Sequence, residues 1–144
     1  MNKDKKWNNP TPVVVCLVLV DTEEGYKALT VRRNIMPKIG ELALPGGFVD
    51  EGETIETAAS RELWEETGIR ANPNNWSLSH SYITEQNRVL IFAVYNLLIG
   101  DENIDLTFKN EEVQELALVN LAEDAEKLCW PSHQEALEMF LMGV

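Results

Sequence analysis

The stretch that decides the fold is residues 46–69, which read GGFVDEGETIETAASRELWEETGI. An apolar residue recurs there at every fourth position, at Ile55, Ala59 and Leu63. This spacing predicts an amphipathic helix over residues 54–67. Thr54 suits the N-cap, and Gly68 followed by an apolar residue is typical of a helix C-terminus. The glycine pair ahead of the helix predicts a tight bend that stops a short extended segment and lets a ligand approach the main chain.

The predicted helix and its approach carry more negative charge than the local sequence neutralises. From residue 53 to residue 66, only Arg61 opposes five glutamates, which are Glu53, Glu56, Glu62, Glu65 and Glu66. The last three are spaced to share one face, near the helix end where the backbone dipole disfavours negative charge. A divalent cation would remove both penalties, and oxygen ligands without a nearby histidine or cysteine favour Mg²⁺ or Mn²⁺ over zinc. A solvated acidic face is the plainer alternative.

The spacing of this stretch also matches a known motif. Gly47, five residues, Glu53, seven residues and then residues 61–69 (RELWEETGI) agree with the Nudix box at every defined position. The chain therefore resembles the Nudix hydrolase family of MutT-like pyrophosphohydrolases. The resemblance implies an α/β fold, a Nudix-type α/β/α sandwich with a mixed β-sheet. We expect residues 1–144 to form a single Nudix domain, with residues 1–11 as a polar N-terminal arm.

The resemblance implies a role for each matching residue. The metal ligands that it implies are Glu62, Glu65, Glu66 and the main-chain carbonyl of Gly46. Arg61 is expected to orient the glutamates, with Glu53 as a supporting carboxylate of the same network and Gly47 as a supporting residue at the bend. The implied cofactor is Mg²⁺, with Mn²⁺ as an alternative.

The group that takes the proton from the attacking water stays open at this point. Glu65 or Glu62 could act as the base within the box, whereas in many relatives the base lies in a later loop. Glu111 and Glu112 lie in a suitable loop here, and Glu112 is the preferred loop candidate. A solvated turn is the alternative interpretation of this acidic pair.

Two consecutive arginines precede the box. Because side chains alternate along a strand, only one of Arg32 and Arg33 can face the site. We expect Arg33 to contact the substrate phosphate and Arg32 to be a surface charge, although Lys38 is a further candidate.

The resemblance implies hydrolysis of a pyrophosphate linkage in a nucleoside diphosphate joined to another moiety, as in ADP-ribose, a nucleotide sugar or a dinucleotide. One alternative is a (d)NTP pyrophosphohydrolase that removes damaged or surplus nucleotides. Another is a non-catalytic domain that senses a nucleotide, which the complete set of box carboxylates disfavours. No substrate marker downstream of the box is convincing. Aromatic residues that could stack on a base are Trp7, Tyr26, Trp76, Tyr82 and Phe108.

Composition limits the partners. The 144 residues, 44% of them hydrophobic, are enough for one domain with a real core. With 12 basic and 24 acidic residues, the chain has no basic footprint for nucleic acid, and a small-molecule nucleotide would need a local reversal of charge. The longest apolar run, Val13–Val20, is too short for a membrane span. We expect a cytoplasmic protein without membrane attachment, and the resemblance allows a homodimer.

The apolar pattern predicts the remaining elements. Val13–Val20 is expected to be one central strand covered on both faces, and residues 27–33 its hairpin partner. Other expected strands are residues 41–44, 76–84, 88–98, 106–108 and 113–119. Residues 121–128 are expected to be helical, and a second helix is expected after a capping box of Ser132 and Glu135.

Overall fold

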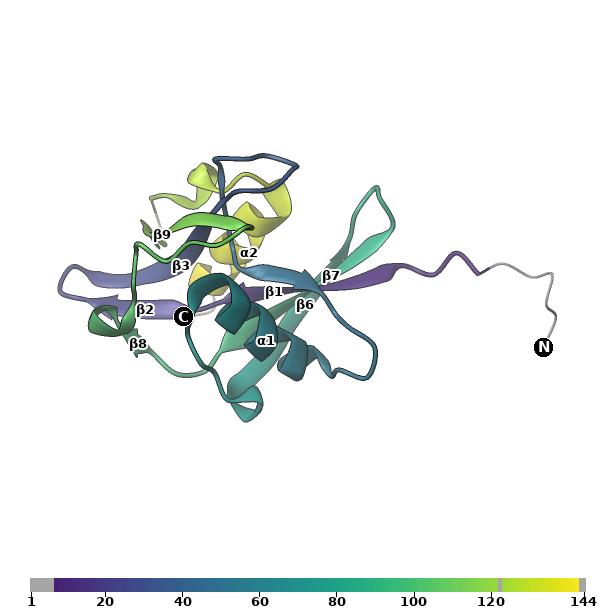
Figure 1. Cartoon of the computed structure of the whole chain (residues 1–144), viewed down its shortest axis with the longest axis horizontal. Coiled ribbons are helices and arrows are strands. Elements are labelled where there is room, and N and C mark those ends of the chain that lie inside the picture. The colour runs from purple at the N-terminus through teal and green to yellow at the C-terminus, as the bar shows by residue number, and fades with distance from the viewer. Residues whose placement is uncertain (1–6, 122, 143–144) are drawn as a thin grey trace.

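The computed structural model describes residues 7–121 and 123–142, which form two β-sheets flanked by two helices (Figure 1). The elements in chain order are β1 (Thr11–Leu17), β2 (Leu19–Thr22), β3 (Gly25–Arg33), β4 (Leu42–Ala43), β5 (Gly46–Phe48), α1 (Ile55–Thr67), η1 (Pro73–Asn75), β6 (Trp76–Ile83), β7 (Arg88–Tyr95), β8 (Ile99–Gly100), η2 (Asp101–Asn103), β9 (Val113–Asn120), η3 (Ala125–Lys127) and α2 (Pro131–Met142).

Both sheets mix parallel and antiparallel pairs. The first has the order β5-β1-β7-β6, with β1 parallel to β7 and antiparallel to β5. The second has the order β4-β3-β2-β8, with β2 parallel to β8 and with β9 paired to β3. The mixed pairing and the α/β class are confirmed. The prediction of a single sheet was wrong, because the strands form two sheets.

The division into two sheets explains why the prediction of one strand over Val13–Val20 was wrong. The chain leaves the first sheet after Leu17 and enters the second at Leu19. Val18 lies between them, and its carbonyl accepts a hydrogen bond from the Leu29 amide at 3.0 Å. Residues 13–20 form one hydrophobic run because the segments on both sides of Val18 are buried. The two segments nevertheless pair with different strands.

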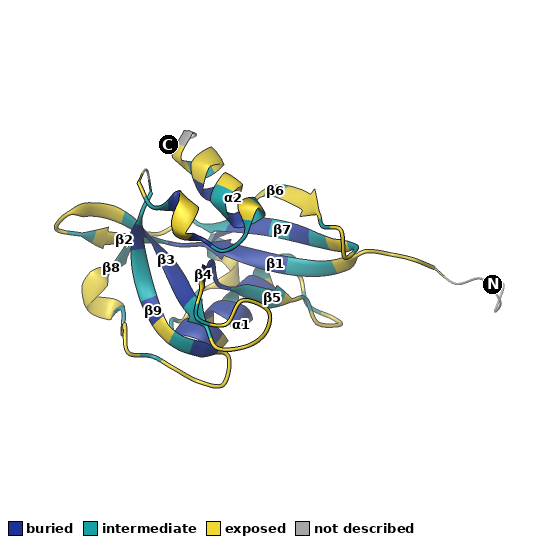
Figure 2. Cartoon of the chain, turned by 90° about the horizontal axis from the view of Figure 1, so that it is seen from above, coloured by how far each residue is buried: buried dark blue, intermediate teal, exposed yellow. Residues whose placement is uncertain are grey.

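Side chains of β1 alternate between two cores. Val14 and Cys16 pack in one core with Leu63 of α1, while Val15 and Leu17 pack in the other. That second core includes Leu137 of α2. The two helices thus lie on opposite sides of β1 and β7 (Figure 2), which confirms the central strand covered on both faces and the α/β/α layering.

The caps of α1 are those that the sequence predicts. The Thr54 side chain accepts a hydrogen bond from the Thr57 amide. Gly68 ends the helix with a φ of 75°, a left-handed conformation that favours glycine, and its amide donates to the Trp64 carbonyl. The helix that carries the glutamates is therefore fixed at both ends by local sequence.

Several other expected boundaries were wrong. Gly46 and Gly47 do not end the extended chain, because they begin β5, which pairs with β1. Strand β7 ends at Tyr95 rather than residue 98, and residues 106–108 form no strand. Within 121–128, of which residue 122 lies outside the described residues, only the short turn η3 is helical. Helix α2 begins at Pro131, so Ser132 lies inside it and is not its cap.

The start of the chain was predicted to be a polar arm. Residues 1–6 lie outside the described residues, and 7–10 are exposed ahead of β1, which already begins at Thr11. Asn87 connects this segment to the body, since its side chain donates to the Asn8 carbonyl at 3.3 Å. In the described part of the chain no helix is both long enough and apolar enough to span a bilayer.

Candidate active site

The turn into β5 and helix α1 form a close cradle around two glutamates. The Gly46 amide donates to Oε1 of Glu66 at 2.8 Å. A β-carbon on Gly47 would lie only 2.5 Å from the Glu62 carboxylate, so a side chain at this position would displace that carboxylate. Glycine at residue 47 is therefore required by the approach of strand to helix rather than by a turn.

Arg61 holds a second set of carboxylates, which we call the Arg61 group: Glu53, Glu62 and Glu65. The Arg61 guanidinium donates to both oxygens of Glu53 at 2.7 and 2.9 Å. The same guanidinium donates to Glu62 at 2.9 Å and to Glu65 at 3.2 Å. Its remaining hydrogen bond, at 2.9 Å, goes to the Phe48 carbonyl of β5. These contacts connect Arg61 and Glu53 with Glu62 and Glu65 in one network, in which the orienting role of Arg61 stays a prediction.

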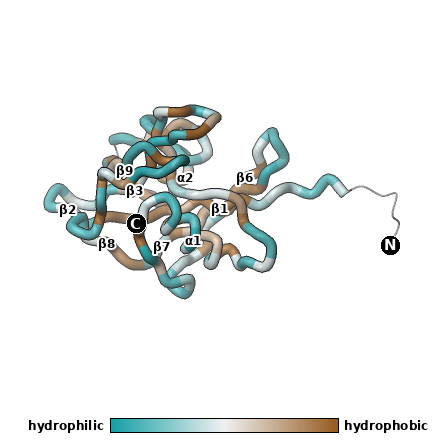
Figure 3. The backbone as a smooth tube through the Cα atoms, in the orientation of Figure 1, coloured by the Kyte–Doolittle hydropathy of each residue, from teal (hydrophilic) through white to brown (hydrophobic). Residues whose placement is uncertain are grey.

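A cavity of about 730 Å³ opens beside this cradle. Four acidic residues line it. Asp50 pairs with Arg61 at 3.4 Å, and we call the other three the cavity carboxylates: Glu62, Glu66 and Glu112. Arg33 and Arg88 also line the cavity, together with the rings of Phe48 and Trp130. The rim includes the exposed apolar loop after β3, with Met36 at 75% exposure, and this loop lies at the top of Figure 3.

The cavity carboxylates lack sufficient neutralising charge. Glu66 is 8% exposed, and burial above all, with added repulsion from Glu62 and Glu112, raises its pKa to about 8 despite the Gly46 hydrogen bond. Burial likewise raises the pKa of Glu62, against the hydrogen bond from Arg61. In contrast, the hydrogen bond from Arg61 lowers the pKa of Glu53. Within the described residues Glu66 forms no ion pair, whereas Glu53 is paired with Arg61.

Asn110 positions the loop that carries Glu112. Its side-chain amide donates to the Glu65 carbonyl at 2.8 Å, and its Oδ1 accepts from the Glu112 amide at 2.8 Å. The loop is thereby tied to the last turn of α1. Sequence reasoning missed Asn110, although an asparagine two residues before the acidic residue is typical of an Asx-turn. Glu111 is exposed and does not line the cavity.

The two arginines of β3 face different ways, as alternation predicts. Arg33 lines the cavity, with Nε donating to the Pro37 carbonyl at 2.7 Å and the guanidinium 4.6 Å from the centre of the Trp130 ring. Arg32 is bound to Glu115 at 2.7 Å and to the Gly40 carbonyl at 2.9 Å, away from the cavity lining. Within the described residues Arg33 forms no ion pair, so its charge is available to the cavity.

Comparison with known proteins places this geometry in a family. The NUDIX domain family matches residues 10–142. Nudix hydrolase 3 of Caenorhabditis elegans is 30% identical over 127 residues, covering 86% of this chain and 52% of that protein. The chain belongs to the Nudix family. An ADP-ribose pyrophosphatase of Methanocaldococcus jannaschii is 51% identical over 47 residues, covering 33% of this chain and 28% of that protein. The chain thus spans about half or less of these two relatives.

Solved structures confirm the Nudix fold. The NUDIX domain of Shewanella oneidensis NrtR, complexed with ADP ribose, superimposes with a TM-score of 0.76 at 19% identity, covering 98% of this chain and 92% of that one. A MutT protein from Methanosarcina mazei Go1 superimposes with a TM-score of 0.70 at 24% identity, covering 96% and 98%. At these identities the likeness shows the shared fold.

The residues that would hold a metal in this Nudix domain are only partly gathered. Glu62 and Glu66 share the cavity, but the Glu65 side chain is 46% exposed, binds Arg61 and is not in the lining. Among residues 7–121 and 123–142, no three acidic, histidine or cysteine side chains converge as a ready-made cage. The donor set nevertheless fits a hard divalent cation, because it consists of oxygens and burial raises the pKa of two of its carboxylates, Glu62 and Glu66.

The aromatic residues at the Nudix cavity are not those expected from the sequence. None of the five aromatic candidates lies in the cavity lining within the described residues; Trp76, for example, is buried and donates to Ser60. Phe48 and Trp130 are there instead, with Arg88 placed 5.0 Å from the Phe48 ring. Trp130 could not be recognised because the sequence places it far from the box.

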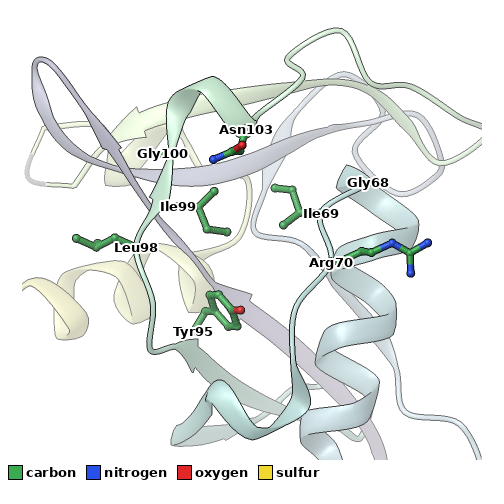
Figure 4. A pocket seen from close by; sticks show the side chains of 8 residues that line it. All are labelled: Gly68, Ile69, Arg70, Tyr95, Leu98, Ile99, Gly100 and Asn103. Atoms are coloured by element: carbon green, nitrogen blue, oxygen red, sulfur yellow. The ribbon is translucent and has the colours of Figure 1, made fainter.

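A smaller hollow of about 360 Å³ lies past the C-terminal end of α1 (Figure 4). Its lining includes Arg70, Tyr95 and Asn103 but no carboxylate within the described residues. It therefore lacks the acidic chemistry of the Nudix cavity, which remains the candidate active site.

Proposed function

We propose that this Nudix protein hydrolyses the pyrophosphate linkage of a nucleoside diphosphate joined to another moiety, with Mg²⁺ as cofactor and Mn²⁺ as an alternative. The observation that carries the proposal is the gathering of the carboxylates Glu62, Glu66 and Glu112 in one cavity beside Arg33, where burial raises the pKa of Glu62 and Glu66. The relative named ADP-ribose pyrophosphatase and the NrtR domain complexed with ADP ribose support a substrate of the ADP-ribose type.

The proposed metal ligands are Glu62, Glu65, Glu66 and the carbonyl of Gly46. Glu66 is already oriented by the Gly46 amide, and Glu62 by Arg61. For Glu65 to join them, its 3.2 Å contact with Arg61 must loosen, which its exposure permits. The chemistry that a bound divalent cation supplies is neutralisation of the diphosphate charge and acidification of water.

Glu112 is the proposed general base. Its carboxylate lines the cavity and forms no hydrogen bond or ion pair within the described residues, while its backbone is fixed by Asn110. A base needs an acceptor that is free to take a proton from the attacking water. Glu62 and Glu65, the other candidates, both accept hydrogen bonds from Arg61, so each already has an oxygen engaged by a donor.

Arg33 is the proposed phosphate contact. Its guanidinium is held by the carbonyls of Met36 and Pro37 and by the Trp130 ring, and its side chain lines the cavity. A cation there offsets the long-range repulsion between a diphosphate and a chain with a formal net charge of −12. The Arg32 side chain, which Glu115 neutralises, is not part of this proposal.

A product assay tests the proposal. Purified protein with Mg²⁺ or Mn²⁺ is given ADP-ribose, a nucleotide sugar, a dinucleotide and the common nucleoside triphosphates, and the products are identified. Nucleoside monophosphate plus sugar phosphate is the expected result. Nucleoside monophosphate plus pyrophosphate would favour the (d)NTP pyrophosphohydrolase instead. Binding of nucleotide without any turnover would favour the non-catalytic sensing domain.

A further inference from the structure

His133 is a buried histidine that faces the cavity. It lies in the first turn of α2, is 6% exposed and lines the cavity beside Trp130. Its ring is 5.1 Å from the Trp130 ring and meets the edge of Phe92 at 6.2 Å, so neighbouring rings fix its orientation.

The hydrogen bonds of His133 determine which nitrogen carries the proton. The Leu44 amide donates to Nδ1 at 3.1 Å, so Nδ1 must be unprotonated. Burial lowers the pKa of His133 to about 3, which keeps the ring neutral. A neutral imidazole with Nδ1 as acceptor carries its proton on Nε2. The main chain of the segment before β5 therefore fixes the tautomer.

The Nε2–H group is left without a partner. Within residues 7–121 and 123–142 it forms no hydrogen bond, and no side-chain nitrogen or oxygen there is both enclosed and unpaired. Nε2 is therefore open to the cavity that His133 lines. A donor held in place with nothing to donate to is costly unless water or a ligand supplies the acceptor.

The surroundings of Nε2–H are mostly apolar. The cavity lining there includes Val15, Leu44 and Leu90, each at least nine-tenths buried. We call these three residues with His133 and Trp130 the His133 lobe. Val15 is in register with Phe92, whose ring contacts His133, which places the lobe over the first sheet. The polar groups of the lobe side chains are two neutral donors, the imidazole N–H of His133 and the indole N–H of Trp130. Such a lobe suits a flat group with a ring acceptor.

The His133 lobe lies close to the acidic cradle. Leu44, which binds His133, and Gly46, which binds Glu66, are two residues apart on one extended segment. Two residues of extended chain span roughly 7 Å. If the phosphates of a nucleotide lie at Glu66, the group attached to the other end of its ribose therefore reaches the His133 lobe.

We propose that the His133 lobe holds the nucleobase of the substrate and that His133 Nε2–H donates a hydrogen bond to a ring nitrogen of that base. The inference rests on the proposed function and deepens it, because it assigns the residue that selects the base. His133 is a binding residue in this scheme and takes no part in the proton transfers.

Substrate analogues test the hydrogen bond. ADP-ribose is compared with three analogues in which N1, N3 or N7 of adenine is replaced by C–H. Wild-type protein should cleave one of the three with a kcat/KM about tenfold below that for ADP-ribose, since the buried donor loses its acceptor. His133→Phe should lose this discrimination. His80→Gln is the matched control, because His80 also stacks on Phe92 but does not line the cavity, and it should discriminate like wild type.

Equal cleavage of all four substrates by wild type, or unchanged discrimination by His133→Phe, would overturn the inference. A second measurement uses the unmutated protein, so it remains informative if His133→Phe does not fold. It also requires no turnover. Nitrogen-15 NMR of the metal-free protein should find the Nε2–H tautomer from pH 5 to 8. AMP should shift the Nε2 resonance, and ribose 5-phosphate should not. An Nδ1–H tautomer, or the same shift with both ligands, would refute the role of His133 even if ADP-ribose is hydrolysed, whereas absence of hydrolysis alone would refute the proposed function.

Discussion

Two sets of carboxylates share helix α1 and differ in how their charge is balanced. In the Arg61 group, one guanidinium donates to Glu53, Glu62 and Glu65, and the pKa of Glu53 falls. In the cavity, Glu62, Glu66 and Glu112 repel one another, and the pKa of Glu66 rises. Glu62 belongs to both sets, so it connects the balanced side to the unbalanced one.

The difference indicates how a structural carboxylate can be distinguished from a ligand. A carboxylate that is paired and hydrogen-bonded is stable as an anion without help. A carboxylate that is buried beside others of the same sign is stable as an anion only when a cation arrives. We therefore expect the Arg61 group to hold α1 against β5, and the cavity carboxylates to bind a cation.

The largest expected effect is the loss of turnover in Glu66→Gln. The amide oxygen of glutamine can still accept from the Gly46 amide, so the fold should persist while the negative charge is lost. We expect kcat with Mg²⁺ to fall by about a thousandfold or more, since a cation at the reaction centre contributes several kcal/mol. Circular dichroism checks the fold, and turnover near the wild-type rate would contradict the assignment.

The second effect separates Glu112 from the metal ligands. Glu112→Gln should reduce kcat about a hundredfold, the lower range for loss of a general base, with little change in metal affinity. Asn110→Ala should produce part of this loss, because it frees the loop without removing the carboxylate. If Glu112→Gln lost as much Mn²⁺ affinity as Glu66→Gln, Glu112 would be a metal ligand instead of the base.

The third effect concerns the balanced side. Arg61→Lys cannot reproduce the fork that binds Glu53 and reaches the Phe48 carbonyl, so it leaves acceptors unpaired. Because Arg61 is partly exposed, we expect a loss of about 2 kcal/mol in unfolding free energy, below that of a fully buried pair. Chemical denaturation measures it. A variant as stable as wild type would mean that the Arg61 group does not hold α1 to β5.

The fourth effect uses neighbouring arginines as a matched pair. Arg33→Gln should raise KM about tenfold, as expected for loss of one charge-assisted hydrogen bond to phosphate. Arg32→Gln should leave KM unchanged, because its partners Glu115 and Gly40 lie outside the cavity lining. Steady-state kinetics measures KM for the two variants. Equal changes in KM would refute the assignment of Arg33 as the phosphate contact.

The smallest effect is a dependence of stability on pH. A carboxyl group whose pKa is raised on folding binds more protons in the native state than in the unfolded state, so stability falls as pH rises between the two values. For Glu66 this interval runs from 4.5 to about 8. Metal-free wild type should lose at least about 1 kcal/mol, or roughly 3 °C in Tm, relative to Glu66→Gln between pH 5.5 and 8. Parallel curves for the two proteins would contradict the charge imbalance.

The sequence predicted the balanced and local features best. Helix α1, both of its caps and the alternation of Arg32 and Arg33 follow from spacing within a few residues. The interruption at Val18 could not be predicted, since it depends on which distant strands pair on either side. The glycines of β5 have the composition of a turn, yet their pairing with β1 makes them a strand.

The cavity walls were the least predictable part of the site. His133 and Trp130 come from the start of α2 and Arg88 from the start of β7, so only the tertiary fold brings them to the box. The pKa of Glu66 also depends on burial, which the sequence does not specify. The acidic residues of the box were recognisable, but their division into neutralised and unneutralised sets required the positions of Arg61 and β5.

Calorimetric titration of metal-free protein with Mn²⁺ at pH 7, in two buffers of different ionisation enthalpy, tests the charge imbalance most directly. Below its pKa of about 8, Glu66 holds a proton that a cation must displace, so wild type should bind Mn²⁺ and release close to one proton. Glu115→Gln, whose carboxylate faces Arg32, should behave identically, and Glu66→Gln should bind weakly without proton release. Absence of Mn²⁺ binding, or binding without proton release in wild type, would contradict the account.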